Sequence, residues 1–329
     1  MKRIGLVSLG VALSAGMASA GERGQPLRPA HTYSIVARDP ATGELGVAVQ
    51  SHWFSVGTLV TWAEAGVGAV ATQSFVEVSY GPLGLELMRA GKSAPAALKA
   101  LLAADDGREV RQVAMIDAHG GVAAHTGSKC IAAAGHLVGT NFSAQANLME
   151  KDTVWPAMAR AFESASGDLT DRLLAALEAA QREGGDIRGQ QSAAILVVRG
   201  QSTGRPWADH VVDLRVEDHP NPIGELKRLV RVHRAYRHMD AGDVCAAKKD
   251  WESAAREYGA AEKLLPNNPE VVFWFAVTLA TAGRVEEALP LFQKVFAREP
   301  KWAELVERLP ASELLPADEK LIARIKAQR

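Results

Sequence analysis

The chain has 329 residues, 47% of them hydrophobic, which is long enough for one large domain and a smaller one. Its formal net charge of −1 and the lack of a basic run argue against nucleic acid as the main partner. Its two cysteines, Cys130 and Cys245, are too few for a disulfide scaffold.

Residues 1–20 have the pattern of an export signal. MKR is a positive start, IGLVSLGVALSAGM is a short apolar run, and ASA at 18–20 fits a small-residue cleavage site. The run is too short for a membrane span, which needs roughly 20 apolar residues, and no later stretch approaches that length. We expect cleavage after Ala20, residues 21–31 as a linker or propeptide, and a location in the periplasm or outside the cell.

Residues 32–220 predict a first domain of strands and helices. Alternating apolar and polar residues predict strands at 32–38 and 45–51, two more within 58–74, a hairpin within 112–127, and strands at 141–149, 192–200 and 209–219. Helical spacing predicts helices at 81–91 and 93–105, with Ser93 as N-cap, and two more that start near Asp152 and Asp168. Such runs of strands favour an α+β fold in which two stacked sheets lie between helical layers.

Residues 221–329 predict helices and contain an internal repeat. WESAAREYGAAEKLLP and VEEALPLFQKVFAREP superpose at an offset of 34 residues, with Ala254 on Ala288 and Tyr258 on Phe292. This is the period and pattern of tetratricopeptide repeats. Such repeats bury a core by stacking, and two are few. We therefore expect them to pack on the first domain, to self-associate or to bind a protein partner.

Motifs of several enzyme classes are missing. AGVGAVAT has glycines but neither a following Lys nor a helix start, so it does not predict a phosphate site. The histidines form no metal signature, and His119 and His125 are interpreted as turn and strand residues. No Gly-x-Ser-x-Gly elbow supports an α/β-hydrolase. We expect no metal and no organic cofactor.

Thr32 opens the first predicted strand and has two interpretations. Threonine favours strands, and from the pattern alone an ordinary strand residue is the favoured interpretation. As the first residue of a chain, however, a threonine can be a nucleophile whose own α-amine takes the hydroxyl proton. That amine titrates at about 7.7–8.0, so a useful fraction is neutral at physiological pH.

A family resemblance is carried by the stretches TYSIVARDPATGELGVAVQS, AEAGVGAVATQSFVEVSYGPLGLELMRAG, RQVAMIDAHGGVAAHTGSKCIAAAGH, QANL, GGDIRGQQSAAILVVRG and VVDLRVEDHPNPIGELKRL. From residue 32 to about residue 235, the chain is similar to the family called domain of unknown function 1028, which is placed in the N-terminal-nucleophile (Ntn) hydrolase superfamily. The resemblance implies a four-layer αββα sandwich. Relatives of this kind also carry a trailing tetratricopeptide-like segment.

The resemblance implies that Thr32 is the catalytic nucleophile. Many family members begin Met-Thr-Phe-Ser-Ile, so removal of Met leaves the matching threonine first. Here residues 1–31 precede Thr32, and cleavage after Ala20 would leave it internal. A second cleavage, between His31 and Thr32, is therefore required for this mechanism.

Other site residues come from the same matching stretches, and among them the substrate-binding candidates are His52, Gln145, Cys130 and His136. Ser51 ends the second strand, where superfamily enzymes often keep a polar partner for the nucleophile, and His52 stands where relatives often carry Lys. Gln73, Gln145 and Asn147 end or interrupt apolar strands. Their amides are interpreted either as donors to a substrate amide or oxyanion, or as partners of strand-edge backbone groups.

Four further residues have chemical and structural interpretations. Glu64 and Asp117 are either acid–base groups or turn residues, and turn residues are favoured. Cys130 and His136 are expected in one loop, where a Cys–His nucleophile pair is conceivable. A buried small hydrophobe is the favoured interpretation of Cys130.

Two functions are expected from these observations. The first is hydrolysis of an amide bond in a small molecule or peptide, with Thr32 and Ser51 in the catalytic group and Gln73 or Asn147 at the oxyanion. The second is a catalytically silent binding module whose helical repeats recruit a protein partner. The segment before Thr32 favours the second unless it is removed.

Overall fold

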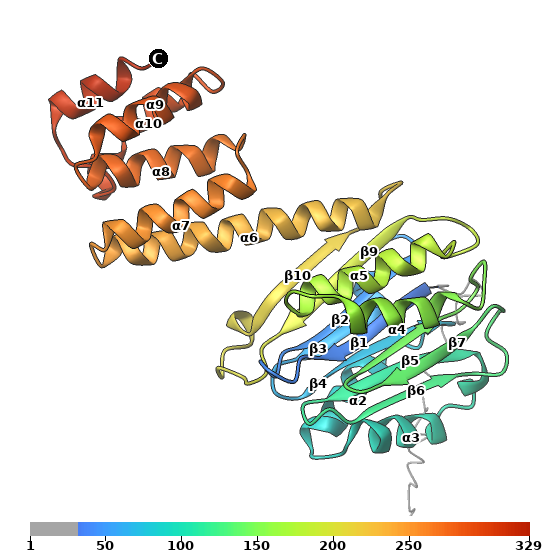
Figure 1. The fold of residues 1–329 in the computed structure, drawn as a ribbon. Coiled ribbons are helices and arrows are strands. Elements are labelled where there is room, and N and C mark those ends of the chain that lie inside the picture. Colours follow the sequence, from blue (N-terminus) through green and yellow to red (C-terminus); the bar gives the residue numbers. More distant parts are fainter. Residues whose placement is uncertain (1–31) are drawn as a thin grey trace, which may run out of the picture.

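We describe residues 32–329 of the protein from a computed structural model. The expectations for residues 1–31, namely the export signal, cleavage after Ala20 and the linker, lie outside the described residues. Two antiparallel sheets and a C-terminal series of helices make up the described chain (Figure 1). None of its helices between residues 32 and 329 is both long enough and apolar enough to cross a membrane.

The larger sheet has six strands in the order β10-β9-β2-β1-β8-β7. These are β1 (Thr32–Arg38), β2 (Leu45–Ser51), β7 (Gly135–Gly139), β8 (Phe142–Ala146), β9 (Ser192–Val198) and β10 (His210–Val216). The smaller sheet has the order β3-β4-β5-β6, with β3 (Thr61–Glu64), β4 (Gly68–Ser74), β5 (Arg111–Asp117) and β6 (Val122–Thr126). The strand predictions for 32–38 and 45–51 agree with β1 and β2.

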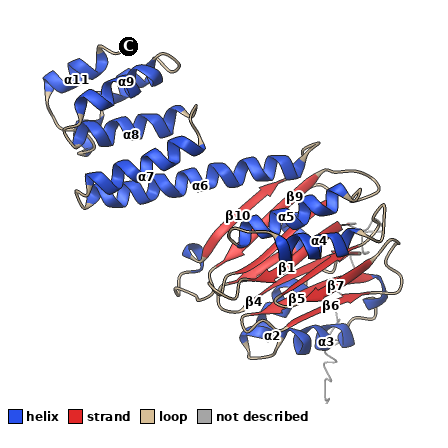
Figure 2. Ribbon diagram, in the orientation of Figure 1, coloured by secondary structure: helices blue, strands red, loops and turns tan. Residues whose placement is uncertain are grey.

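Helices cover the outer face of each sheet (Figure 2). Against the six-stranded sheet lie α4 (Val154–Ser164) and α5 (Leu169–Arg182), and against the four-stranded sheet lie α2 (Tyr80–Arg89) and α3 (Ala94–Ala104). Ser93 is the N-cap of α3, as predicted, and its side chain accepts a hydrogen bond from the Ala96 N–H. The inner faces of the two sheets share an apolar core that includes Val36, Val47 and Ala114. The coarse α+β prediction is confirmed.

Two local predictions differ from the structure. Residues 57–60 form a short helix, α1 (Gly57–Val60), rather than the start of a strand. The chain passes here from β2 in one sheet to β3 in the other, and a tight turn makes this change of sheet. The prediction that His136 lies in a loop is wrong, because it belongs to β7. This short edge strand forms because it pairs with β8. Glycine disfavours strands, so the glycines at its two ends weaken the strand pattern in the sequence.

The C-terminal helices begin with α6 (Pro222–Ala247), which contributes to both parts of the chain. Its first half packs on β9 and β10, with Ile223, Leu226 and Val230 in the core of the larger sheet. Its second half packs against α7 (Trp251–Leu264). After α7 come α8 (Pro269–Thr281), α9 (Val285–Phe296), α10 (Trp302–Val306) and α11 (Glu319–Lys326). Three short 3-10 helices complete the described chain: η1 (Arg108–Val110), η2 (Pro206–Ala208) and η3 (Leu309–Ser312).

Candidate functional site

One end of the space between the sheets is polar, whereas the rest of it is apolar. Polar residues share the inward strand face with apolar ones, so that Thr32 and Ser34 precede Val36 on β1, and Gln73 follows Ala71 on β4. The start of β1 and the end of β2 meet here, because Thr32 pairs with Ser51. The fully buried residues of this polar cluster are Thr32, Ser34, Ser51, Gln73, Gln112, Ser143, Gln145, Asn147 and Ser192.

Gln112, the second residue of β5, joins the two sheets at this end. Its Nε2 donates to Thr126 Oγ1 at 2.9 Å on β6, within its own sheet. The same nitrogen lies 2.9 Å from the Ala146 carbonyl oxygen and 3.2 Å from that of Gly135, both in the other sheet. A buried amide with this many partners holds the strands at one separation, because moving either sheet would leave polar groups unpaired.

The other atom of the Gln112 amide organises the donors around Thr32. Gln112 Oε1 accepts hydrogen bonds from Gln73 Nε2 at 2.6 Å and from Asn147 Nδ2 at 2.8 Å. The same two nitrogens lie 3.2 and 3.5 Å from the Thr32 carbonyl oxygen, which also accepts from the Asn147 backbone N–H at 3.1 Å. The main chain of Thr32 is therefore held by donors from β4 and from the residue after β8.

The Thr32 side chain lies beside Ser51. Thr32 Oγ1 donates to Ser51 Oγ at 3.3 Å across the β1–β2 pair. Thr32 and Ser51 are both fully buried. Thr32 and Ser51, which the family resemblance names as nucleophile and polar partner, thus lie side by side.

Gln145 lies on β8, two residues before Asn147, and its amide is deeper in the polar cluster. Its Nε2 donates to Ser34 Oγ at 2.6 Å, and its Oε1 accepts from Ser143 Oγ at 3.0 Å. Ser34 Oγ in turn donates to Gln73 Oε1 at 2.6 Å. Gln145 therefore orients Gln73 through Ser34, and its own amide is occupied inside the cluster.

His52, Cys130 and His136 take separate partners. The His52 backbone N–H donates to the buried Asp186 carboxylate at 3.2 Å, while His52 Nδ1 is buried with no hydrogen-bond partner among the described residues. Cys130 Sγ donates to the Arg111 carbonyl oxygen at 3.3 Å. His136 Nδ1 lies 2.8 Å from Thr126 Oγ1, so His136 adjoins the polar cluster through Thr126.

Cys130 is expected to be a poor nucleophile. Burial raises the pKa of its thiol. Since the thiolate is the reactive form, Cys130 in the folded protein should react with iodoacetamide at pH 7 about tenfold more slowly than in protein unfolded in urea. Peptide mass spectrometry of timed samples measures both rates. Faster labelling of the folded protein would contradict this prediction and favour the Cys–His interpretation.

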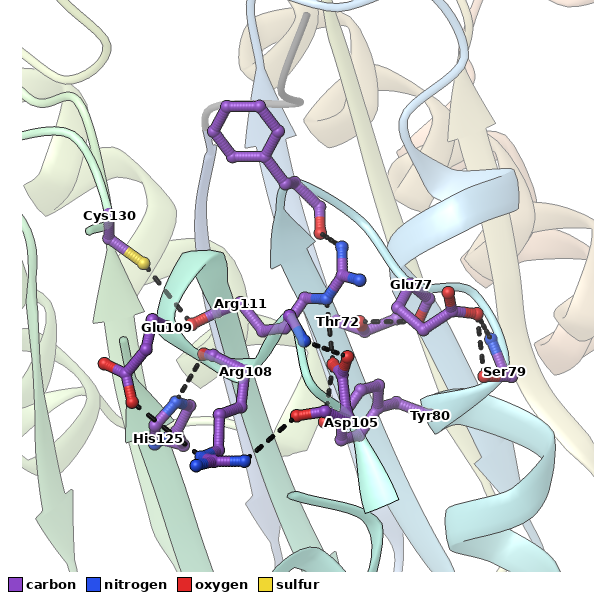
Figure 3. A network of polar contacts seen from close by, with 12 residues as sticks. Thr72, Glu77, Ser79, Tyr80, Asp105, Arg108, Glu109, Arg111, His125 and Cys130 are labelled. Carbon is purple, nitrogen blue, oxygen red and sulfur yellow. Dashed lines mark hydrogen bonds and ion pairs between the residues drawn. The ribbon is translucent and has the colours of Figure 1, made fainter. Parts of the chain in front are cut away.

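Arg111, immediately before Gln112, anchors the start of β5 from the opposite face (Figure 3). Its side chain is 2% exposed, with Nε 2.9 Å from Asp105 Oδ2 and Nη1 2.7 Å from the Phe75 carbonyl oxygen. The Tyr80 hydroxyl donates to the same Asp105 oxygen at 3.0 Å. Burial opposes ionisation of Asp105, but its hydrogen bonds from Arg111 and the Gly107 N–H hold its pKa below the usual value.

Glu64 and Asp117 occupy the far ends of their strands. Glu64 pairs with Arg89 of α2 on the surface. The Asp117 carboxylate accepts backbone N–H groups of His119, Gly121 and Ala94 at 2.8–3.0 Å. These contacts agree with the favoured turn interpretation. A cavity of about 1070 Å³ lies at this same end, lined by loops that include residues 38–44, 64–67 and 199–203, away from Thr32.

Residues 32–329 contain no group of three or more His, Cys, Asp or Glu side chains arranged to hold a metal ion. What the described residues do build is a buried cluster of amides and hydroxyls around the first residue of a sheet strand. The chain is therefore an antiparallel α+β protein with a polar site between its sheets and a helical repeat segment after it.

The chain belongs to the family of unknown function DUF1028, whose model matches residues 32–226. A tetratricopeptide repeat model matches residues 246–309. Among solved structures, the chain is similar to a DUF1028-family protein from Silicibacter pomeroyi, with 34% identity and a TM-score of 0.55 over 61% of this chain and 88% of that one. No curated protein matches the chain. The predicted family and the predicted repeats are confirmed.

Sequence reasoning missed Gln112, Ser34 and Arg111. A signal for Gln112 exists, because it shares strand parity with Ala114 and Ile116, which face the opposite sheet. Ser34 likewise shares parity with Thr32. No comparable signal marks Arg111, because arginine is rarely fully buried and its partners come from separate loops.

Proposed function

We propose that residues 32–220 form a four-layer αββα sandwich of the Ntn type, and that the protein is an exported amide-bond hydrolase with Thr32 as nucleophile. The observation that carries the proposal is the position of Thr32. It is the first residue of β1, its hydroxyl faces the polar end between the sheets, and its carbonyl oxygen is held by Gln73 and Asn147. A nucleophile must be held rigidly, and these contacts supply that rigidity.

The reaction requires a free amine at Thr32. Thr32 Oγ attacks the carbonyl carbon of the substrate amide, and the hydroxyl proton passes to the Thr32 α-amine. When the carbon–nitrogen bond breaks, the departing amine takes this proton and leaves an ester on Thr32. Water, deprotonated by the same α-amine, then attacks the ester, releases the carboxylic acid and restores Thr32.

The amides of the cluster act as positioning groups in this proposal. Gln73 and Asn147 are engaged with the Thr32 carbonyl oxygen and with Gln112, so they orient the nucleophile. In this proposal Ser51 accepts a hydrogen bond from Thr32 Oγ1 at 3.3 Å and so orients the hydroxyl whose proton passes to the α-amine. In this proposal the oxyanion is stabilised by backbone N–H groups of the substrate-bound site. The substrate is an amide in a small molecule or a peptide.

The N-terminal residue of the exported protein tests the mechanism. We expect the intact mass of protein recovered from the periplasm or medium to correspond to a chain that begins at Thr32. A chain that begins at Gly21 would support export but exclude a free Thr32 amine. In that case the domain would be a silent binding module. Protein retained in the cytoplasm with Met1 would contradict the export signal.

A further inference from the structure

A second site lies in the helical repeats, far along the chain from Thr32. A cavity of about 540 Å³ is lined by α6, α7 and α8, and by residues just after η3. From α6 it takes one helix face that includes Tyr236, Asp240 and Asp243, and from α8 it takes Glu270 and Trp274. Nothing in the proposed hydrolase reaction uses these residues.

The cavity is lined by acidic residues without basic ones. Its carboxylates come from Asp240, Asp243, Glu270 and Glu313, and no Lys, Arg or His is among the residues of the described chain that line it. Asp240 and Glu313 are exposed, so their charges face solvent at the cavity. A surface with four carboxylates and no compensating cation attracts positively charged groups.

Two tyrosines keep the other carboxylates in place. The Tyr236 hydroxyl donates to Glu270 at 2.7 Å and so bridges α6 to α8. The Tyr258 hydroxyl donates to Asp243 and bridges α7 to α6. The hydrogen bond to Glu270 raises the pKa of Tyr236, and burial raises that of Tyr258, so both phenols stay protonated as donors. The side chains of Glu270 and Asp243 are thereby fixed before any ligand binds.

Four aromatic side chains also line the cavity: Tyr236, Trp251, Tyr258 and Trp274. Tyr236 is 37% exposed, and both tryptophans are partly exposed. Aromatic rings attract ammonium and guanidinium groups and also cover the aliphatic stems of Lys and Arg. Carboxylates beside aromatic rings therefore favour long cationic side chains over simple inorganic cations.

We propose that this cavity binds an extended, lysine- or arginine-bearing segment of a partner protein. The lining of α6 extends from Tyr236 to Ala247, which is about 16 Å of helix at about 1.5 Å per residue. An extended peptide covers that length with about five residues at about 3.3 Å each. The length of the α6 lining therefore fits a short peptide segment, and the negative charge of the cavity favours Lys and Arg side chains in that segment.

Fluorescence anisotropy with the full chain tests this proposal. The probe is a fluorescein-labelled peptide of alternating serine and lysine, and the matched peptide carries glutamate in place of lysine. We expect the lysine peptide to bind, more weakly as salt is raised, and the glutamate peptide not to bind. The double variant Asp240→Asn with Glu313→Gln should weaken binding of the lysine peptide about tenfold.

The matched control is Glu252→Gln with Glu304→Gln. It removes the same charge from exposed positions on α7 and α10 that do not line the cavity. Binding by this control should stay within about twofold of the unchanged protein. Equal weakening by both double variants would assign binding to overall charge and overturn the proposal. So would equal affinity for the two peptides, or no binding of the lysine peptide at low salt.

Discussion

Replacing Thr32 with alanine is expected to abolish hydrolysis, with a loss of about a thousandfold or more. The hydroxyl that attacks the amide is removed, and no other group in the cluster combines a hydroxyl with a chain-terminal amine. Both proteins are prepared behind a cleavable tag, so that residue 32 is the first residue of each. The measurement is the initial rate of release of a chromogenic amine from a panel of acyl anilides.

A covalent probe makes this test independent of the natural substrate. A β-lactone is expected to acylate Thr32, and peptide mass spectrometry locates the adduct. Thr32→Ala should take up no adduct, whereas Thr58→Ala, which removes an exposed threonine hydroxyl on α1, should react like the unchanged protein. An adduct at another residue in both variants, or full activity in Thr32→Ala, would refute the proposed nucleophile.

Gln112→Leu is expected to lower the free energy of unfolding by about 3–5 kcal/mol. Leucine has nearly the same size but offers no amide, so Gln73 and Asn147 each lose a buried acceptor. The Ala146 and Gly135 carbonyl oxygens lose a donor at the same time. Urea unfolding, monitored by circular dichroism, measures this change in the free energy of unfolding from the transition of the N-terminal domain.

The control for this effect is Gln201→Leu, which makes the same chemical change at an exposed position in the β9–β10 connection. Its free energy of unfolding should change by less than about 0.5 kcal/mol. If Gln112→Leu is no more destabilising than this control, the cluster does not hold the two sheets together.

Elements with a strong local pattern were predictable. The alternation in TYSIVAR and LGVAVQS agrees with β1 and β2 because each strand has two different faces to satisfy. Ser93 and Asp168 are N-caps, as their positions before apolar periodic runs indicate. The strand β7 and the helix α1 were not predicted. The strand β7 depends on its pairing with β8, and α1 lies where the chain passes from one sheet to the other, so neither has a strong local pattern.

The candidate site was predictable one residue at a time, but not as an arrangement. Thr32, Ser51, Gln73 and Asn147 are each candidates because they lie at the ends of predicted strands or interrupt them, within stretches that resemble the family. Their partners could not be assigned, because Gln73 and Asn147 reach the Thr32 carbonyl oxygen from 41 and 115 residues along the chain. Gln112, which both amides share, was overlooked as an ordinary strand residue.

Sequence alone therefore settled the period of the elements with a strong local pattern, such as β1 and β2, together with the tetratricopeptide repeat and the place of Thr32 at the start of a strand. These properties depend on neighbours within a few residues or on a repeated pattern. The two-sheet stacking determined which strand ends meet, so it determined that the amides of Gln73, Gln112 and Asn147 converge at Thr32. Burial makes that convergence specific, because a polar group removed from water must find its partner within the fold.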